Sequence, residues 1–209
     1  MEPRRVGSLI LLIVILIVTG GLASCGEVRS APKGSSQGKS SDTEQTEDRL
    51  RESRRALNQT QVNMRDLSRA LMVYGNDNNG LNPPDLATLA GHYVPTPEQF
   101  VNPRLIKDID YDNPSNPRQW VEMYCDYELL LPSRRSWEVR SPAGTALIIE
   151  VWPEGVDPDQ RLIAYADGHI EIHDRAEAEA IIAESRKVAE ELRPRQHPPV
   201  QEPTRWPDH

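Results

Sequence analysis

The spacing of apolar residues changes along this chain from a helical repeat to a strand repeat. Between residues 48 and 75 they recur every seven residues, with a second row offset by three, at Leu50, Leu57, Met64, Leu67, Leu71 and Tyr74. This pattern places one apolar stripe on a long helix. From residue 121 onward apolar and polar residues alternate, as in strands that are buried on one side. One long helix followed by several strands predicts an α+β domain.

Four segments carry the strand pattern, near residues 121–131, 145–152, 161–166 and 169–173. Asp167 and Gly168 separate the last two, and an Asp-Gly pair between alternating runs predicts a hairpin with a type I′ turn. Asp174, with Glu177 three residues later, predicts a closing helix that starts with a capping box. We therefore expect the helix at 48–75 to pack on a three- or four-stranded antiparallel sheet.

The first 25 residues have the layout of an export signal. A pair of arginines precedes an apolar run from Leu9 to Val18, and small residues then lead to Cys25. A basic start, an apolar core and a small-residue exit are typical of a secretory signal. Residues 6–23 are 18 residues long, at the lower edge of what spans a bilayer, so an uncleaved transmembrane helix is the alternative. Under both interpretations the following residues lie outside the cytoplasm.

The residues just before the cysteine favour the first interpretation. Leu22-Ala23-Ser24-Cys25 resembles the lipobox of bacterial lipoproteins. In that family the cysteine is acylated and becomes the first mature residue, so the resemblance implies lipid attachment at Cys25. We expect a membrane-anchored protein on the extracytoplasmic side of the bacterial cell envelope, with the membrane and other envelope proteins as partners.

Composition divides the remaining chain into a tether, a domain and a tail. Residues 26–47 contain almost no apolar side chains, which predicts a flexible tether. Residues 48–193 carry the α+β pattern. Residues 194–209 contain five prolines among 16 residues, which predicts a disordered tail. The formal net charge of −8 argues against a nucleic-acid partner, because such partners require a basic surface.

Two segments of the domain resemble the pseudopilin-like proteins of bacterial type II secretion. Residues 64–80, which read MRDLSRALMVYGNDNNG, and the following Pro83-Pro84 are similar to a helix end, an Asn-rich loop and a Pro-Pro pair in that family. Tyr165-Ala-Asp-Gly-His-Ile170 is similar to the phrase that closes its last hairpin. The resemblance covers residues 55–175. It implies a pilin-like headpiece with a non-enzymatic structural or interaction role that is linked to type II secretion.

The N-terminus departs from the pilin pattern. Pilins follow the glycine of their cleavage site with Phe-Thr-Leu-Ile-Glu, whereas here Gly7 is followed by Ser-Leu-Ile-Leu and the glutamate position holds Leu12. A polar tether also interrupts what is one continuous helix in a pilin. Both departures argue against polymerisation and suggest a headpiece that is carried on a lipid or helix anchor.

One candidate metal site lies on the last hairpin. His169, Glu171 and His173 share one side of their predicted strand, with Asp167 beside them, which leaves Ile170 and Ile172 for the core. These four side chains would define a metal-binding module or a metal-dependent hydrolase, the alternative function. A solvated strand face is the competing interpretation, because structural zinc usually takes four closed ligands.

A second candidate is a calcium loop at Asp108, Asp110 and Asp112, whose carboxylates occupy alternate positions. Asn113 and Gln119 stand where an EF-hand loop requires Gly and Glu, so that pattern is not met. We expect no catalytic activity, because no nucleophile elbow, phosphate-binding loop or zinc-protease motif is present. Calcium and zinc remain the possible cofactors.

Overall fold

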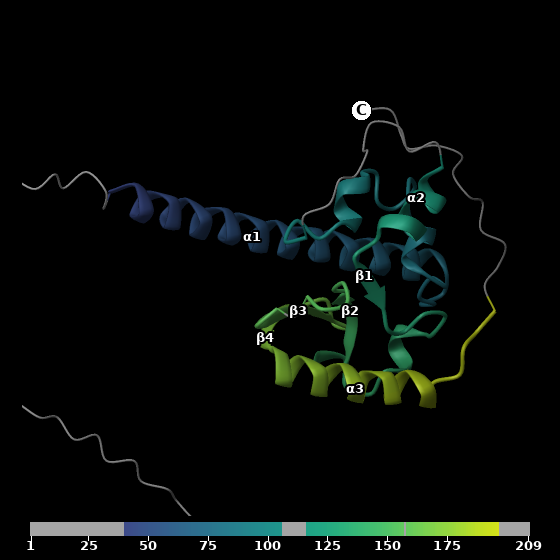
Figure 1. The fold of residues 1–209 in the computed structure, drawn as a ribbon. Helices are drawn as coiled ribbons and strands as arrows, with labels where there is room; N and C mark the ends of the chain where they lie inside the picture. The colour runs from purple at the N-terminus through teal and green to yellow at the C-terminus, as the bar shows by residue number, and fades with distance from the viewer. Residues whose placement is uncertain (1–39, 106–115, 157, 197–209) are drawn as a thin grey trace, which may run out of the picture. The chain divides into compact units, whose positions relative to one another are not determined.

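Helix α1 (Ser40–Asp77) leads the described part of the chain in the computed structural model, which comprises residues 40–105, 116–156 and 158–196 (Figure 1). It begins before the predicted Asp48, so residues 40–47, which we assigned to the tether, are helical. The predicted signal at residues 1–25 lies outside these ranges and stays a prediction. Among the helices that are described, none combines the length and the apolarity needed to cross a membrane.

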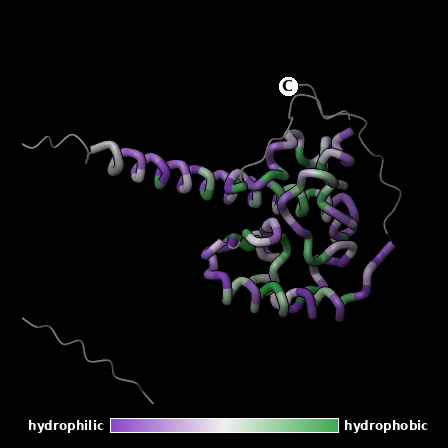
Figure 2. The backbone as a smooth tube through the Cα atoms, in the orientation of Figure 1, coloured by the Kyte–Doolittle hydropathy of each residue, from purple (hydrophilic) through white to green (hydrophobic). Residues whose placement is uncertain are grey.

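The apolar stripe of α1 is buried over only part of its length. Met64, Leu67, Leu71 and Tyr74 are almost completely buried, whereas Leu50 is 55% exposed. The helix therefore packs on the rest of the domain through its C-terminal half. In its N-terminal half Leu57 of the same heptad row is partly buried against the core, whereas residues 44–55 are exposed and project from the other described elements (Figure 2).

Four antiparallel strands form one sheet in the order β1-β2-β3-β4. They are β1 (Tyr127–Leu129), β2 (Ala146–Glu150), β3 (Gln160–Tyr165) and β4 (Ile170–Asp174). Ile149 pairs with Glu128 on one side and with Ile163 on the other, which fixes the register across the centre. This sheet and α1 confirm the predicted α+β arrangement, in which a long N-terminal helix packs on a four-stranded antiparallel sheet as in a pilin-like headpiece.

The two faces of the sheet are covered by different helices (Figure 1). On one face Ile148, Leu162 and Ala164 join the core that contains the buried half of α1. On the other face Ile149, Ile163 and Tyr165 pack against Ala178 and Ile182 of α3 (Arg175–Glu191). Strand residues alternate between these two cores because successive side chains point to opposite sides of a sheet.

The predicted strand at 121–131 is wrong in its first half. Helix α2 (Pro117–Tyr124) occupies that half, and a strand is present only at Tyr127–Leu129. Asn116 caps the helix by accepting a hydrogen bond from Gln119 N, and Pro117 stands at its first position. Both are strong helix-start signals that the period-two pattern concealed. Met123, which the alternation placed in the core, is 69% exposed.

Within the described residues, the connections between these elements contain four short 3₁₀ helices, and one hairpin turn differs from the predicted type. The 3₁₀ helices are η1 (Leu86–Leu89), η2 (Pro97–Phe100), η3 (Ser136–Glu138) and η4 (Pro142–Gly144). The β3–β4 hairpin forms as predicted, but Tyr165 N donates to His169 O, so three residues make the loop. Gly168 has φ +91°, whereas Asp167 is not in the left-handed region. The predicted type I′ turn, which needs positive φ at both central residues, is therefore wrong.

Candidate functional site

Strands β3 and β4 and the start of α3 bring six polar or aromatic side chains together. We call this group the hairpin cluster; it comprises Tyr165, Asp167, His169, Glu171, His173 and Glu177. Glu171 pairs with Ile163 and His173 with Arg161, so the two residues lie on the sheet face that α3 covers. The structure thus brings together all four residues of the predicted hairpin metal site.

His173 is the centre of the hairpin cluster and is only 7% exposed. Its Nε2 lies 2.8 Å from the Tyr165 hydroxyl, and its Nδ1 lies 3.0 Å from Glu177 Oε2. The solvated strand face that we considered is therefore wrong for His173, because α3 packs over it. Glu177 directs its carboxylate to this imidazole, while Asp174 caps α3 by accepting from Glu177 N. Conversely, Ile172, which we expected in the core, is 39% exposed.

His169 occupies the outer end of the cluster. Its ring stacks on Tyr165 with 4.2 Å between the centroids and 5° between the planes. Its Nδ1 is hydrogen-bonded to Asp167 Oδ1. Desolvation acts to raise the pKa of Asp167, but hydrogen bonds from His169 outweigh it and lower that pKa below its ordinary value.

Glu171 lies between the two imidazoles, with one carboxylate oxygen toward each. The distances are 3.8 Å from Oε1 to His169 Nε2 and 3.4 Å from Oε2 to His173 Nε2. Both nitrogens of His173 already have partners, and within the described ranges no three His, Cys, Asp or Glu side chains are grouped to hold a metal ion. The cluster is arranged as a chain of alternating acids and imidazoles. Cys25 and the possible calcium ligands Asp108, Asp110 and Asp112 lie outside the described residues.

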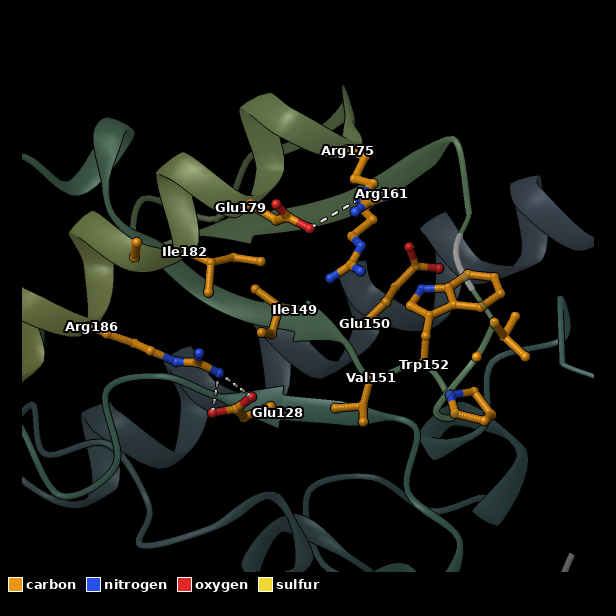
Figure 3. A pocket seen from close by; sticks show the side chains of 14 residues that line it. Glu128, Ile149, Glu150, Val151, Trp152, Arg161, Arg175, Glu179, Ile182 and Arg186 are labelled. Carbon is orange, nitrogen blue, oxygen red and sulfur yellow. Dashed lines mark hydrogen bonds and ion pairs between the residues drawn. The ribbon is translucent and has the colours of Figure 1, made fainter.

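A groove of about 710 Å³ opens on the same sheet face, between α3, the end of β2 and the following loop (Figure 3). Ile149, Val151, Trp152 and Ile182 supply its apolar wall. Three glutamates and three arginines also line it: Glu128, Glu150, Glu179, Arg161, Arg175 and Arg186. The side chain of Glu150 has no exposed area, so its carboxylate does not face a ligand in this groove.

Two of these arginines form ion pairs across or along the groove. Arg186 Nη2 lies 3.0 and 3.2 Å from the two carboxylate oxygens of Glu128, and Arg175 Nε lies 3.1 Å from Glu179 Oε1 (Figure 3). Both pairs are exposed, and such pairs contribute at most about 1 kcal/mol each. The first one links α3 to β1. These contacts hold the walls of the groove and do not present a vacant cation to a substrate.

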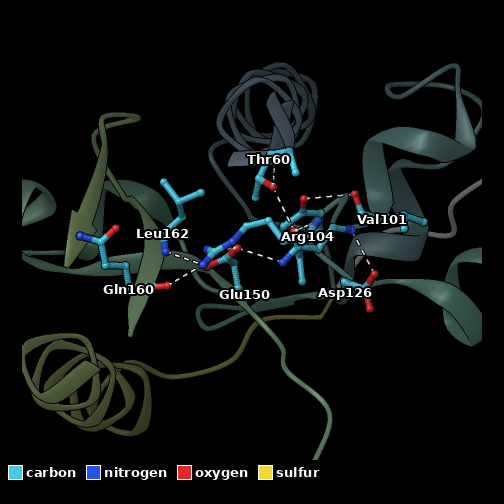
Figure 4. A network of polar contacts seen from close by, with 10 residues as sticks. Thr60, Val101, Arg104, Asp126, Glu150, Gln160 and Leu162 are labelled. Atoms are coloured by element: carbon cyan, nitrogen blue, oxygen red, sulfur yellow. Dashed lines mark hydrogen bonds and ion pairs between the residues drawn. The ribbon is translucent and has the colours of Figure 1, made fainter. Parts of the chain in front are cut away.

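The buried carboxylate of Glu150 organises the opposite face of the sheet (Figure 4). It accepts from Leu162 N at 2.7 Å, from Asn102 Nδ2 at 2.9 Å and from Arg104 Nη1 at 3.2 Å. Its side chain has no exposed area, while Arg104 keeps 18%. We call these contacts the Glu150 network. Glu150 belongs to β2, whereas its donors belong to β3 and to the loop at residues 102–104. The network therefore fastens this loop to β2 and β3.

The Glu150 network also reaches helix α1. Thr60 donates from Oγ1 to Asn102 Oδ1 at 3.0 Å, and Asn102 N donates to Asp126 Oδ2 at 3.0 Å. Arg104 additionally donates to Gln160 O at 3.1 Å and lies 4.7 Å from the centre of the Trp152 ring. The network therefore positions the first buried turn of α1 against the sheet, which is a structural role.

We expect Glu150→Gln to change the pH dependence of the free energy of unfolding. Desolvation raises the pKa of Glu150 above its ordinary 4.5, and its hydrogen bonds offset this only in part. A raised folded-state pKa gives a stabilising contribution that is complete below pH 4.5 and is lost as pH rises through the folded pKa. Urea unfolding between pH 4.5 and 7 should show wild-type stability declining relative to the variant as pH rises. Parallel profiles would contradict this assignment.

The sequence analysis did not identify the Glu150 network or the roles of Tyr165 and Glu177 in the hairpin cluster. The sequence does indicate that Glu150 is unusual, because it is a carboxylate in the apolar segment 145–152. A buried charge of this kind needs partners, but the sequence does not say which ones. Cys125 is half-buried, and its Sγ lies 3.4 Å from Tyr127 O.

Comparison with protein-family models, with curated proteins and with solved structures found no match.

Proposed function

We propose that this chain is a membrane-anchored protein of the bacterial envelope whose α+β headpiece has a non-enzymatic structural or interaction role, related to that of the secretion pseudopilins. The anchor is the N-terminal segment, through acylated Cys25. The headpiece is the described domain, and its partners are other envelope proteins. Type II secretion is the process to which the sequence resemblance points.

The observation that carries the proposal is the division of α1 into two halves. The C-terminal half is built into the core through Met64, Leu67 and Leu71, whereas the N-terminal half remains exposed and precedes the headpiece in sequence. This exposed half carries Leu50, which belongs to the same seven-residue row as Met64 and Leu71. An extended helix between a predicted anchor and a folded head suits a protein that presents its head away from a membrane.

The contacts of the chemically versatile side chains support a role without catalysis. His173 uses both ring nitrogens inside the hairpin cluster, and Glu150 is fully buried in its network. A catalytic acid, base or nucleophile must reach a substrate within hydrogen-bond distance. These two groups are instead committed to contacts between neighbouring segments, which is how a structural polar group behaves.

We expect Cys25→Ala to abolish lipid attachment. Mass spectrometry of the wild-type N-terminus should show a mature chain that begins at acylated Cys25, and the variant should accumulate with residues 1–24 uncleaved. Each buried methylene contributes about 0.8 kcal/mol, so several acyl chains hold a soluble domain firmly at a membrane.

Cys125→Ala is the matched control, because it removes the other cysteine of the chain and should leave acylation intact. If the wild type instead keeps residues 1–24 and Cys25→Ala changes nothing, the lipid anchor is wrong and residues 6–23 are a transmembrane anchor. The proposal as a whole would be contradicted by a wild-type chain that does not sediment with membranes.

The alternative function, a metal-binding module or metal-dependent hydrolase, makes a different prediction from the same purified chain. Elemental analysis would find stoichiometric zinc or calcium, and a double substitution of His169 and His173 would remove the zinc. The proposed headpiece role expects sub-stoichiometric metal in both samples.

A further inference from the structure

A second groove lies where α1 ends, beside the β3–β4 loop and η3. Its volume is about 470 Å³. We call it the tip groove. Leu71, Met72, Trp137, Leu147 and Ala166 supply apolar surface, and Asn76, Asn79, Asn82 and Ser136 supply polar atoms. Two large apolar side chains on it are strongly exposed, Trp137 at 59% and Met72 at 52%.

Trp137 is exposed but held in place. Its ring lies directly against Gly80, where an added Cβ would overlap the ring, and Gly80 has φ +72°. The guanidinium of Arg135, two residues before Trp137, lies 5.0 Å from the centre of the Trp137 ring. Ser136 N donates a hydrogen bond to Gly80 O at 3.0 Å. A rigid, exposed tryptophan loses little conformational entropy on binding, which makes it an effective anchor for a ligand.

The C-terminal end of the described chain is fastened to the segment that carries Trp137. Arg195 N donates to Ser133 O at 2.8 Å, and Arg195 Nη2 lies 3.0 Å from Glu138 Oε1. Arg195, which we assigned to a disordered tail, is therefore in contact with this segment. The described chain ends at Gln196, one residue after Arg195, whose contacts lie on the segment that carries Trp137.

We propose that residues 197–209 bind in the tip groove of the same chain and cover Trp137 and Met72. Their sequence, HPPVQEPTRWPDH, is rich in proline, and such segments prefer the polyproline II conformation. Polyproline II segments dock in grooves that are lined by aromatic rings. Their backbone makes no internal hydrogen bonds, so side-chain amides and hydroxyls such as those of Asn76, Asn79 and Ser136 complement it.

Length and tethering both favour this occupant. At about 3.1 Å per residue the segment reaches roughly 40 Å, more than enough to lie across a groove that begins near its origin. A short link gives a local concentration in the millimolar range, so even weak intrinsic binding is sufficient. The segment would then compete with any external protein for the exposed tryptophan. This inference does not depend on the membrane anchor or on the proposed function.

Methionine oxidation tests the inference, because three methionines of the domain report different environments. Met72 lies on the tip groove, Met123 is 69% exposed on α2, and Met64 is completely buried. In the full chain, dilute peroxide and peptide mass spectrometry should show sulfoxide forming several-fold more slowly at Met72 than at Met123. A chain that ends at residue 196 should oxidise Met72 about as fast as Met123.

Two further variants of the full chain separate the groove from the tail. Changing Pro198, Pro199 and Pro203 to serine should expose Met72 like the truncation, and so should Trp137→Ala. Slow oxidation of Met64 in every sample verifies that the domain is folded. Equal rates at Met72 and Met123 in the full chain would overturn the inference. So would protection that survives truncation, or protection that weakens on dilution, since the latter would indicate binding by a second copy.

Discussion

Arg104→Ala is expected to lower the free energy of unfolding by about 3–5 kcal/mol, because it removes the cation that faces a fully buried carboxylate. Glu150 would keep its bonds from Leu162 and Asn102 but lose the guanidinium at 3.2 Å. Removing one partner of a buried ion pair costs more than the pair contributes, since the remaining charge is stranded in a medium that solvates it poorly. Urea unfolding followed by circular dichroism would measure the change.

Arg186→Ala is the matched control for this prediction. Arg186 also pairs with a glutamate, Glu128, but its side chain is 55% exposed and that of Glu128 is 42% exposed. The loss there should be about 1 kcal/mol or less. Equal effects of the two substitutions would contradict the idea that burial of Glu150 is what makes the loss of Arg104 costly.

Features that depend on local sequence were predicted well. The seven-residue stripe identified α1, and the alternating runs around Asp167 and Gly168 identified the hairpin. Asp174 caps α3 as expected. These signals lie within a few residues of the elements they define, so no knowledge of the fold is needed to use them.

Features that depend on the fold were missed, or were predicted with the wrong environment. Strand geometry predicted the side of β4 on which His173 lies. The burial of His173, however, depends on α3, which packs on that side only in the folded domain. The strand predicted at residue 121 was wrong because Pro117, Trp120, Val121 and Tyr124 also have helical spacing, and this row is the one that α2 packs on the core. The partners of Glu150 come from segments that are far apart in sequence, so no local pattern identifies them.

The last prediction compares two leucines of the same heptad row. Leu71→Ala should lower the free energy of unfolding by about 2–5 kcal/mol, because the residue is only 2% exposed and the change leaves a cavity in the core. Leu50→Ala should change stability by less than about 0.5 kcal/mol, since Leu50 is 55% exposed. The two substitutions are chemically identical and lie on one helix, so helix propensity cancels between them.

The outcome bears directly on the role of the N-terminal half of α1. If Leu50→Ala leaves the stability of the domain unchanged, the exposed half adds nothing to the folding of the headpiece. Its apolar row is then available for contact with a partner protein. A loss at Leu50 that approached the loss at Leu71 would mean that another part of the protein covers this half. The division of α1 into a packed half and an exposed half, on which the proposed function rests, would then be wrong.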